Sequence, residues 1–147
     1  MNKNSKCMIL VLMCIFLATM YSYCEGVETY GNIVISSVTN VYDGDTFTAN
    51  INGWPDIISK NISIRIYGID TPELKGTREE VKQIAILAKS FSASALLGDK
   101  TIELRNIRRG KYFRIIAEVY IDGKNLSELL LKSGLAKKYY GGKRPIW

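Results

Sequence analysis

The chain has 147 residues, 47% of them hydrophobic, which suits one domain with a buried core rather than two domains. It contains no histidine, and this excludes Ser-His-Asp and Cys-His catalysis, HExxH zinc sites and nucleases with a histidine base. The formal net charge of +6 favours anionic partners such as nucleic acid, anionic lipid or phosphorylated ligands.

The sequence predicts a leader over residues 1–24 and one domain over residues 25–147. Two lysines precede an uncharged apolar stretch over residues 7–20, which is the pattern of a secretory signal peptide. The stretch is shorter than the ~20 residues of a spanning helix, and an uncleaved membrane anchor is the alternative interpretation. Small residues at positions 22 and 24 are compatible with cleavage after Cys24, and lipidation of Cys24 is the alternative interpretation. All three cysteines lie in the leader, so we expect a secreted or periplasmic domain without disulfides or thiolate zinc sites.

The domain is predicted to contain five strands and two helices in the order β-β-β-α-β-β-α. Alternating apolar residues indicate strands, and an apolar stripe at helical spacing indicates the first helix. Gly98 ends that helix, and Asn125 with Glu128 begins the second as a capping box. This order is that of an OB-fold, a five-stranded barrel of the β-rich α+β class, with two to three packed helices. The predicted strands are residues 33–42, 46–51, 62–66, 101–107 and 113–121, and the predicted helices are residues 79–97 and 126–133.

An acidic turn follows the first predicted strand. The sequence DGDT over residues 43–46 has the signature of a hairpin turn, and such a turn is its structural interpretation. In its functional interpretation, the turn holds Asp43 and Asp45 facing a hard cation, because calcium and magnesium take oxygen ligands. The spacing differs from that of an EF-hand loop.

A second acidic segment, DTPE over residues 70–73, follows the third predicted strand. A proline turn leading toward a helix is its structural interpretation. In the functional interpretation, the proline fixes the backbone so that Asp70 and Glu73 converge, and the carbonyl of Thr71 is free to bind a cation. Arg65, on the preceding strand, points into the same region.

A basic segment, RRGKYFR over residues 108–114, separates the last two predicted strands. It is either a solvated loop or a phosphate clamp, in which arginine forks bind phosphate oxygens and Lys111 adds a point charge. Tyr112, Tyr139 and Tyr140 are candidates for stacking on bases. Together the three segments predict a phosphodiesterase site that combines a metal ion, a carboxylate acting on water and two arginines that stabilise phosphoryl charge.

Four segments in order, VYDGDTF, IRIYGIDTPE, RRGKYFR and DGKNLSELLLKSGLAK, resemble motifs of the thermonuclease family, the staphylococcal-nuclease-like domain. They extend over residues 38–136. The resemblance implies an OB-fold barrel and Ca²⁺-dependent cleavage of DNA and RNA to 3′-phosphate and 5′-hydroxyl ends. It also implies a preference for single-stranded substrate.

The resemblance implies a role for each matching residue. The implied calcium ligands are Asp45, Asp70 and the carbonyl of Thr71, with Asp43 just outside the ligand set. The implied catalytic residues are Glu73, which orients or deprotonates the attacking water, and two arginines, Arg65 and Arg114. The implied nucleotide contacts are Lys111 and Tyr112, at a terminal phosphate, and Tyr140, beside the base.

Two hypotheses from different classes follow. The first is a secreted, monomeric, calcium-dependent endonuclease that meets the membrane only through an uncleaved leader. The alternative is a non-catalytic nucleic-acid-binding domain on the same fold. A degenerate copy is expected to have lost members of the catalytic set, and this chain retains Arg65, Asp45, Asp70, Glu73 and Arg114, which favours the enzyme. A calcium or anionic-lipid binder is a remoter alternative that leaves the arginines unexplained.

Overall fold

The structure is a computed structural model, and it describes residues 28–147. The leader predicted over residues 1–24 lies outside the described residues, so the signal peptide or anchor stays a prediction. Within the described part, no helix is both long and apolar enough to cross a membrane.

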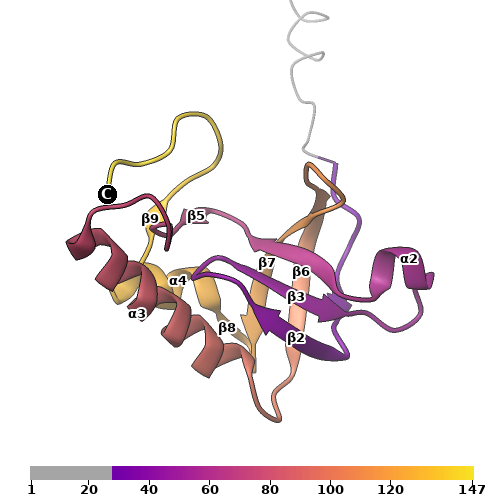
Figure 1. The fold of residues 1–147 in the computed structure, drawn as a ribbon. Helices are drawn as coiled ribbons and strands as arrows, with labels where there is room; N and C mark the ends of the chain where they lie inside the picture. Colours follow the sequence, from indigo (N-terminus) through magenta and orange to yellow (C-terminus); the bar gives the residue numbers. More distant parts are fainter. Residues whose placement is uncertain (1–27) are drawn as a thin grey trace, which may run out of the picture.

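The fold is built on one curled sheet with the strand path β1-β6-β7-β4-β3-β2 and with β8 added beside β7 (Figure 1). Neighbours on this path are antiparallel except β4 and β7, which run parallel. The strands are β1 (Ile33–Val34), β2 (Ser37–Val41), β3 (Thr46–Asn50), β4 (Ile62–Ile66), β6 (Ile102–Arg109), β7 (Ile115–Ile121) and β8 (Lys124–Asn125).

The sheet curls because one stretch of chain pairs at both of its edges. β1 pairs with β6, and β2, which follows two residues later, pairs with β3. Between them, the N–H of Ile35 donates to the carbonyl of Ile102 at 3.0 Å, and that of Ser36 donates to Asn50 at 2.9 Å. The strand predicted over residues 33–42 is therefore two strands, and the architecture is the expected OB-fold-like α+β fold.

Alternation along the strands separates the core from the outer face. In β4, the three isoleucines are buried and Arg65 lies on the opposite face, as predicted. β7 alternates in the same way over its whole length. The largest fully buried apolar side chains are Phe47, Ile64, Ile66, Ile69, Leu96, Leu104, Leu126, Leu130 and Val119.

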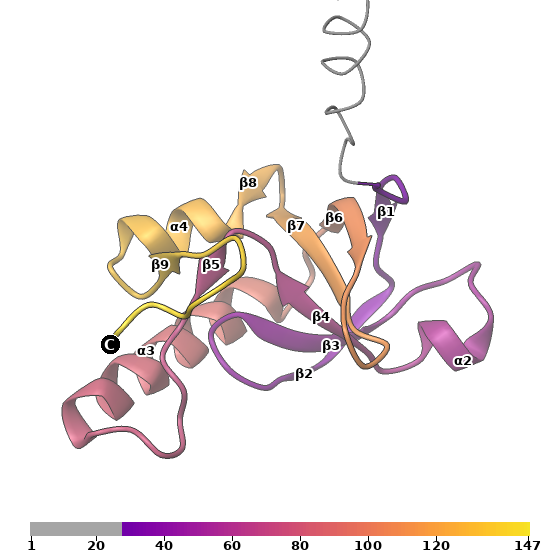
Figure 2. The ribbon, with the colours of Figure 1, turned by 90° about the horizontal axis from the view of Figure 1, so that it is seen from above.

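Three helices of residues 28–147 lie around the sheet. α3 (Glu79–Leu96) buries a stripe that includes Val81, Ala85 and Ala88, and it packs against β2 and α4 (Leu126–Lys132). Asn125 caps the start of α4, because its Oδ1 accepts the N–H of Ser127 at 2.8 Å and that of Glu128 at 3.3 Å. The third helix, α2 (Asp56–Ser59), lies at the opposite end of the sheet from α3 and α4 (Figure 2).

Two local features differ from the sequence prediction. The short helix α2 stands in the loop between β3 and β4, where only a loop was predicted. The strand predicted over residues 113–121 begins only at Ile115, because Tyr112 and Phe113 have φ values of 57° and 59°. This left-handed conformation is incompatible with a strand.

A small second sheet pairs β5 (Ile69–Asp70) with β9 (Lys137–Lys138).

Candidate active site

The acidic turn between β2 and β3 is held against helix α3. Ser92 of α3 donates its hydroxyl proton to the carbonyl of Gly44 at 2.6 Å. A Cβ atom on Gly44 would lie 2.7 Å from Cβ of Ala88 and 2.8 Å from Cγ2 of Thr71, so the turn approaches the helix more closely than any other residue would allow. This contact fixes where the two flanking carboxylates, Asp43 and Asp45, stand.

Asp45 links three segments of the chain from a buried position. Its Oδ1 accepts from Nη1 of Arg65 at 2.6 Å and from the hydroxyl of Thr46 at 2.9 Å. Its Oδ2 accepts the backbone N–H of Thr71 at 2.9 Å. The side chain is only 2% exposed. The β3–β4 register explains the first contact, because Thr46 pairs with Arg65.

Arg65 joins Asp45 to Asp70. Its Nη2 atom donates to Oδ1 of Asp70 at 3.0 Å, while the Asp70 side chain is 3% exposed and that of Arg65 is 12% exposed. Gly68, with φ at +84°, turns the chain between β4 and β5 and so brings Asp70 back toward Arg65. The structure therefore brings Asp45, Arg65 and Asp70 together, and Arg65 points toward Asp70.

The buried acids carry more negative charge than Arg65 alone compensates. Burial, followed by the neighbouring charge of Asp43, raises the pKa of Asp45 to about 7, although Arg65 opposes the shift. Burial also raises the pKa of Asp43. Carboxylates whose ionised form is disfavoured in this way are suited to a cation, because a bound cation restores that form.

The oxygen atoms available at this cluster are chemically suited to binding a hard cation. Asp45, Asp70 and the Thr71 carbonyl offer only oxygen ligands, as calcium requires, and the buried Oγ1 of Thr71 has no hydrogen-bond partner. Within residues 28–147, however, no three His, Cys, Asp or Glu side chains cluster closely enough to form a metal site by themselves. One oxygen of each aspartate is bound to Arg65.

The segment after β9 lies across this acidic cluster. No pattern in the sequence predicted this contact. Arg144 forms an ion pair with Glu73 through Nη1, and its Nε lies 3.6 Å from Oδ1 of Asp70. The indole Nε1 of Trp147 donates to Oδ2 of Asp70 at 3.2 Å. Lys137 donates to the carbonyl of Ile146 at 2.7 Å and so holds the segment down. A mixture of glycine, cations and aromatic residues was the only sequence signal for this role.

A basic cleft of about 830 Å³ opens beside the cluster. Its cationic lining residues are Arg65, Arg108, Arg109, Lys111, Arg114 and Arg144, and its aromatic ones are Tyr30, Tyr67, Tyr139 and Tyr140. The guanidinium carbon of Arg108 stacks 3.8 Å from the centre of the Tyr67 ring. Tyr67 in turn packs edge-to-face against Tyr140 at 5.6 Å. The stacking of Arg108 on Tyr67 is a second feature that the sequence did not reveal.

Several cleft donors have no partner. The Nε and Nη1 atoms of Arg108 and the Nε atom of Arg114 are buried without a hydrogen bond. Buried donors of this kind are rare in folded proteins and are satisfied when an anion binds. The cleft therefore has the chemistry of a phosphate-binding site.

The structure brings most of the predicted site residues together. Arg65 lies in both the acidic cluster and the cleft, and Arg114, Lys111 and Tyr140 line the same cleft. Tyr112 does not join them: its side chain is 94% exposed and contributes nothing to the lining of the cleft. Tyr112 lies in the loop before β7, where its backbone is left-handed with φ at 57°.

Glu73 stands apart from the cleft. It lines a smaller cavity of about 340 Å³ together with Asp70, Thr71 and Arg78. Arg144 lines both this cavity and the cleft, so its side chain separates Glu73 from the predicted phosphate site.

Comparison with known proteins shows the family of the chain. The family model described as staphylococcal nuclease homologue matches residues 63–145. The SPbeta prophage-derived endonuclease YokF of Bacillus subtilis (strain 168) is 34% identical over 111 residues, which are 74% of this chain and 35% of that protein. Endonuclease YncB of the same organism is 33% identical over 111 residues, which are 74% of this chain and 49% of that protein.

A more distant relative, the probable endonuclease C19F8.04c of Schizosaccharomyces pombe, is 27% identical over 127 residues, which are 71% of this chain and 55% of that protein. The chain thus spans about a third to about half of the length of these curated relatives. The family match covers more than half of the chain and includes Arg65, Asp70, Glu73 and Arg114. The chain therefore belongs to the family of staphylococcal nuclease homologues.

Proposed function

We propose that the domain is a nuclease that hydrolyses phosphodiester bonds of DNA and RNA. The observation that carries the proposal is that Arg65 belongs both to the buried cluster with Asp45 and Asp70 and to the basic cleft. A phosphate bound in the cleft would therefore meet the acidic cluster through this side chain. The endonuclease names of the relatives support the same activity.

In the proposed reaction, the scissile phosphate binds between Arg65 and Arg114. Their guanidinium forks stabilise the charge that develops on the phosphoryl oxygens when water attacks. The unpartnered Nε–H of Arg114 supplies one of these donors. Glu73 orients the attacking water or accepts its proton, and it must first separate from Arg144.

We propose Ca²⁺ as the cofactor, held by Asp45, Asp70 and the carbonyl of Thr71. When bound, it would polarise the attacking water and offset negative charge at the phosphate. The all-oxygen donor set, the raised pKa of Asp45 and the unpartnered hydroxyl of Thr71 support this assignment.

The exposed tyrosines favour an unpaired substrate. Tyr140 lines the cleft, is 69% exposed and presents a ring on which a base can stack once it is free of its complement. We therefore propose single-stranded DNA and RNA as preferred substrates. Cleavage to 3′-phosphate and 5′-hydroxyl ends and action as a monomer are proposed from the family resemblance, and secretion is proposed from the predicted leader.

One observation favours the alternative, a nucleic-acid-binding domain that does not cleave. Arg144 pairs with Glu73, so the proposed catalytic carboxylate is not free in this conformation. The cleft itself would bind phosphates whether or not Glu73 is available. The two functions therefore differ in turnover and not in binding.

Hydrolysis of a labelled single-stranded DNA by the purified protein tests the proposal. We expect cleavage in Ca²⁺, no cleavage in EGTA, and a loss of turnover by about 100-fold or more in Glu73→Ser and in Arg114→Ala. Both variants should keep the circular dichroism spectrum of the wild type. Cleavage that persists in EGTA would refute the calcium mechanism. Binding without cleavage in Ca²⁺ would establish the alternative.

A further inference from the structure

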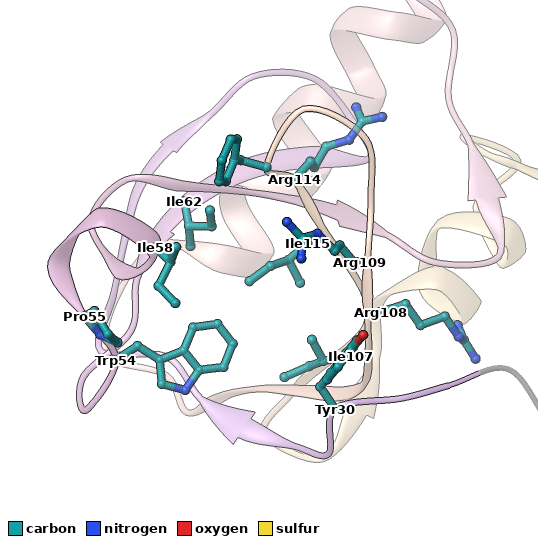
Figure 3. A pocket seen from close by; sticks show the side chains of 11 residues that line it. Tyr30, Trp54, Pro55, Ile58, Ile62, Ile107, Arg108, Arg109, Arg114 and Ile115 are labelled. Atoms are coloured by element: carbon teal, nitrogen blue, oxygen red, sulfur yellow. The ribbon is translucent and has the colours of Figure 1, made fainter.

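A second pocket lies beside the loop between β6 and β7, and the site described above does not account for it. It has a volume of about 380 Å³, within the range of ligand-binding clefts. Trp54, Pro55 and Ile58 approach it from α2 and the preceding loop, and Tyr30, Ile107 and Ile115 approach it from the other side (Figure 3). The pocket is thus formed partly by the loop that the sequence did not predict to contain a helix.

The pocket has an apolar floor and aromatic walls. Ile62, Ile107 and Ile115 are buried at its base, whereas Trp54 is half-buried with its ring directed into the space (Figure 3). Tyr30 is 57% exposed beside it. An apolar pocket lined by an exposed tyrosine and a tryptophan matches the chemistry of an aromatic ring.

The pocket lies next to the basic cleft. Both are lined by the same four residues, Tyr30, Arg108, Arg109 and Arg114. These arginines form a ridge between the two spaces, and Arg108 and Arg114 carry the buried donors that have no partner. A polyanionic strand could cross this ridge with a phosphate on the arginines and one base on either side.

We propose that this pocket is a subsite for a nucleobase of the substrate strand, separated by the arginine ridge from the nucleotide in the basic cleft. The proposal rests on the proposed function, because it extends the same substrate beyond the scissile phosphate. Only an unpaired base can enter the pocket, since a base within a duplex is covered by its neighbours and its complement. The pocket therefore selects for single-stranded substrate longer than the cleft alone can hold.

The charge on the ridge favours nucleic acid over an apolar protein partner. A hydrophobic peptide or a second copy of the chain seated on Trp54 would bury Arg109 and Arg114 against apolar surface and leave these cations without counterions. A nucleic acid strand supplies one phosphate for each base and leaves no such cost.

The test compares binding of a thymidine dinucleotide with binding of a thymidine octanucleotide, in EGTA so that neither is cleaved. We expect Trp54→Ala to weaken octanucleotide binding by roughly 5- to 100-fold, the usual cost of losing one base-stacking contact, and to leave dinucleotide binding unchanged. Ile57→Ala is the matched control, because Ile57 is 88% exposed on α2, which begins soon after Trp54, and does not line the pocket. It should change neither affinity.

A second readout does not depend on the stability of the Trp54→Ala variant. The chain has two tryptophans, Trp54 and Trp147, so Trp147→Phe leaves Trp54 as the one fluorophore of this type. We expect the octanucleotide to quench Trp54 fluorescence and the dinucleotide not to do so. Phe113→Ala, which alters an exposed side chain that lines this pocket and not the cleft, should reproduce the selective loss of octanucleotide affinity.

Three results would overturn the subsite: unchanged octanucleotide affinity in a folded Trp54→Ala variant, an equal loss for both lengths, or self-association of the wild type that Trp54→Ala abolishes. None of these results would contradict the proposed function if the wild type cleaves DNA. Conversely, a wild type that neither binds the octanucleotide nor cleaves DNA in Ca²⁺ would refute both proposals together.

Discussion

At the scale of single residues, the site depends on one guanidinium that binds two carboxylates. Arg65 reaches Asp45 at 2.6 Å and Asp70 at 3.0 Å through separate nitrogens. A planar fork allows this double contact, which a lysine ammonium on a flexible stem does not reproduce with the same geometry. Both aspartates are almost fully buried. An aspartate that lost its ion-pair partner would therefore have little water to solvate its negative charge.

Arg65→Lys tests this arrangement without removing the charge. We expect one aspartate to lose its partner, the free energy of unfolding to fall by about 1–3 kcal/mol, and turnover on single-stranded DNA to fall by about 100-fold. Urea unfolding and the hydrolysis assay measure the two effects. The control is Arg105→Lys, because Arg105 pairs with a half-exposed Glu103 at 2.7 Å, away from the cleft. Similar losses in both variants would show that Arg65 has no special role.

The acidic residues of the site could be predicted from sequence, whereas their partners could not. Asp45, Asp70 and Arg65 are close in sequence to turns and strands whose geometry is local, and the β3–β4 register then fixes their contacts. Arg144 and Trp147 meet Glu73 and Asp70 across about seventy residues of chain, and no local pattern encodes such a contact. The position of Tyr112 outside the lining of the cleft was not predictable for a related reason, because its left-handed backbone is set by the geometry of its loop.

At the scale of elements, most strands and both long helices could be predicted, because their periodicity is strong. The helix predicted over residues 79–97 is α3 almost to the residue, and Gly98 follows it in the left-handed conformation with φ at +104°. The division of the first strand was not predictable, since it arises when the sheet curls and the partner changes from β6 to β3. The helix α2 has one turn only, too short to show a period.

The packing of α3 against the acidic turn gives the next prediction. Gly44→Ala places a methyl group within 2.7 Å of the Ala88 side chain, so either the turn or the helix must move. We expect a loss of about 1–3 kcal/mol in the free energy of unfolding, together with weaker Ca²⁺ binding as Asp45 shifts. Thermal unfolding and calorimetric titration measure these effects. Ser92→Ala, which removes a hydrogen bond but adds no atom, should cost less stability, and equal costs would contradict the steric argument.

The segment after β9 gives a prediction about access to Glu73. The Arg144–Glu73 ion pair involves side chains that are about half exposed, so breaking it costs no more than about 1 kcal/mol. Arg144→Ala should therefore leave stability unchanged and raise kcat/KM on single-stranded DNA by up to about fivefold, because Glu73 no longer has to leave a partner. Lys143→Ala, which removes a neighbouring exposed cation, is the control. A lower kcat/KM in Arg144→Ala alone would mean that Arg144 binds the substrate.

At the scale of the whole molecule, the buried acids link stability to pH and, if the proposed metal site is correct, to Ca²⁺. The pKa of Asp45 rises from 3.8 to about 7 in the folded protein, so the folded state binds more protons than the unfolded state between these values. This contribution to stability is full below pH 4 and is lost as the pH rises through 7, because the slope of the unfolding free energy is negative wherever the folded state holds the extra proton. Calcium binds the ionised carboxylate and should reverse the loss.

We therefore expect the melting temperature in EDTA to fall between pH 5 and pH 8, and Ca²⁺ to raise it more at pH 8 than at pH 5. Asp45→Asn separates this residue from the other titrating groups. Its amide cannot ionise, so the decline with pH should become shallower and the Ca²⁺ shift should shrink. Differential scanning calorimetry of both proteins across this range measures the effect. If the variant keeps the wild-type slope and the wild-type Ca²⁺ shift, Asp45 is neither the titrating group nor a ligand, and the proposed metal site must lie elsewhere.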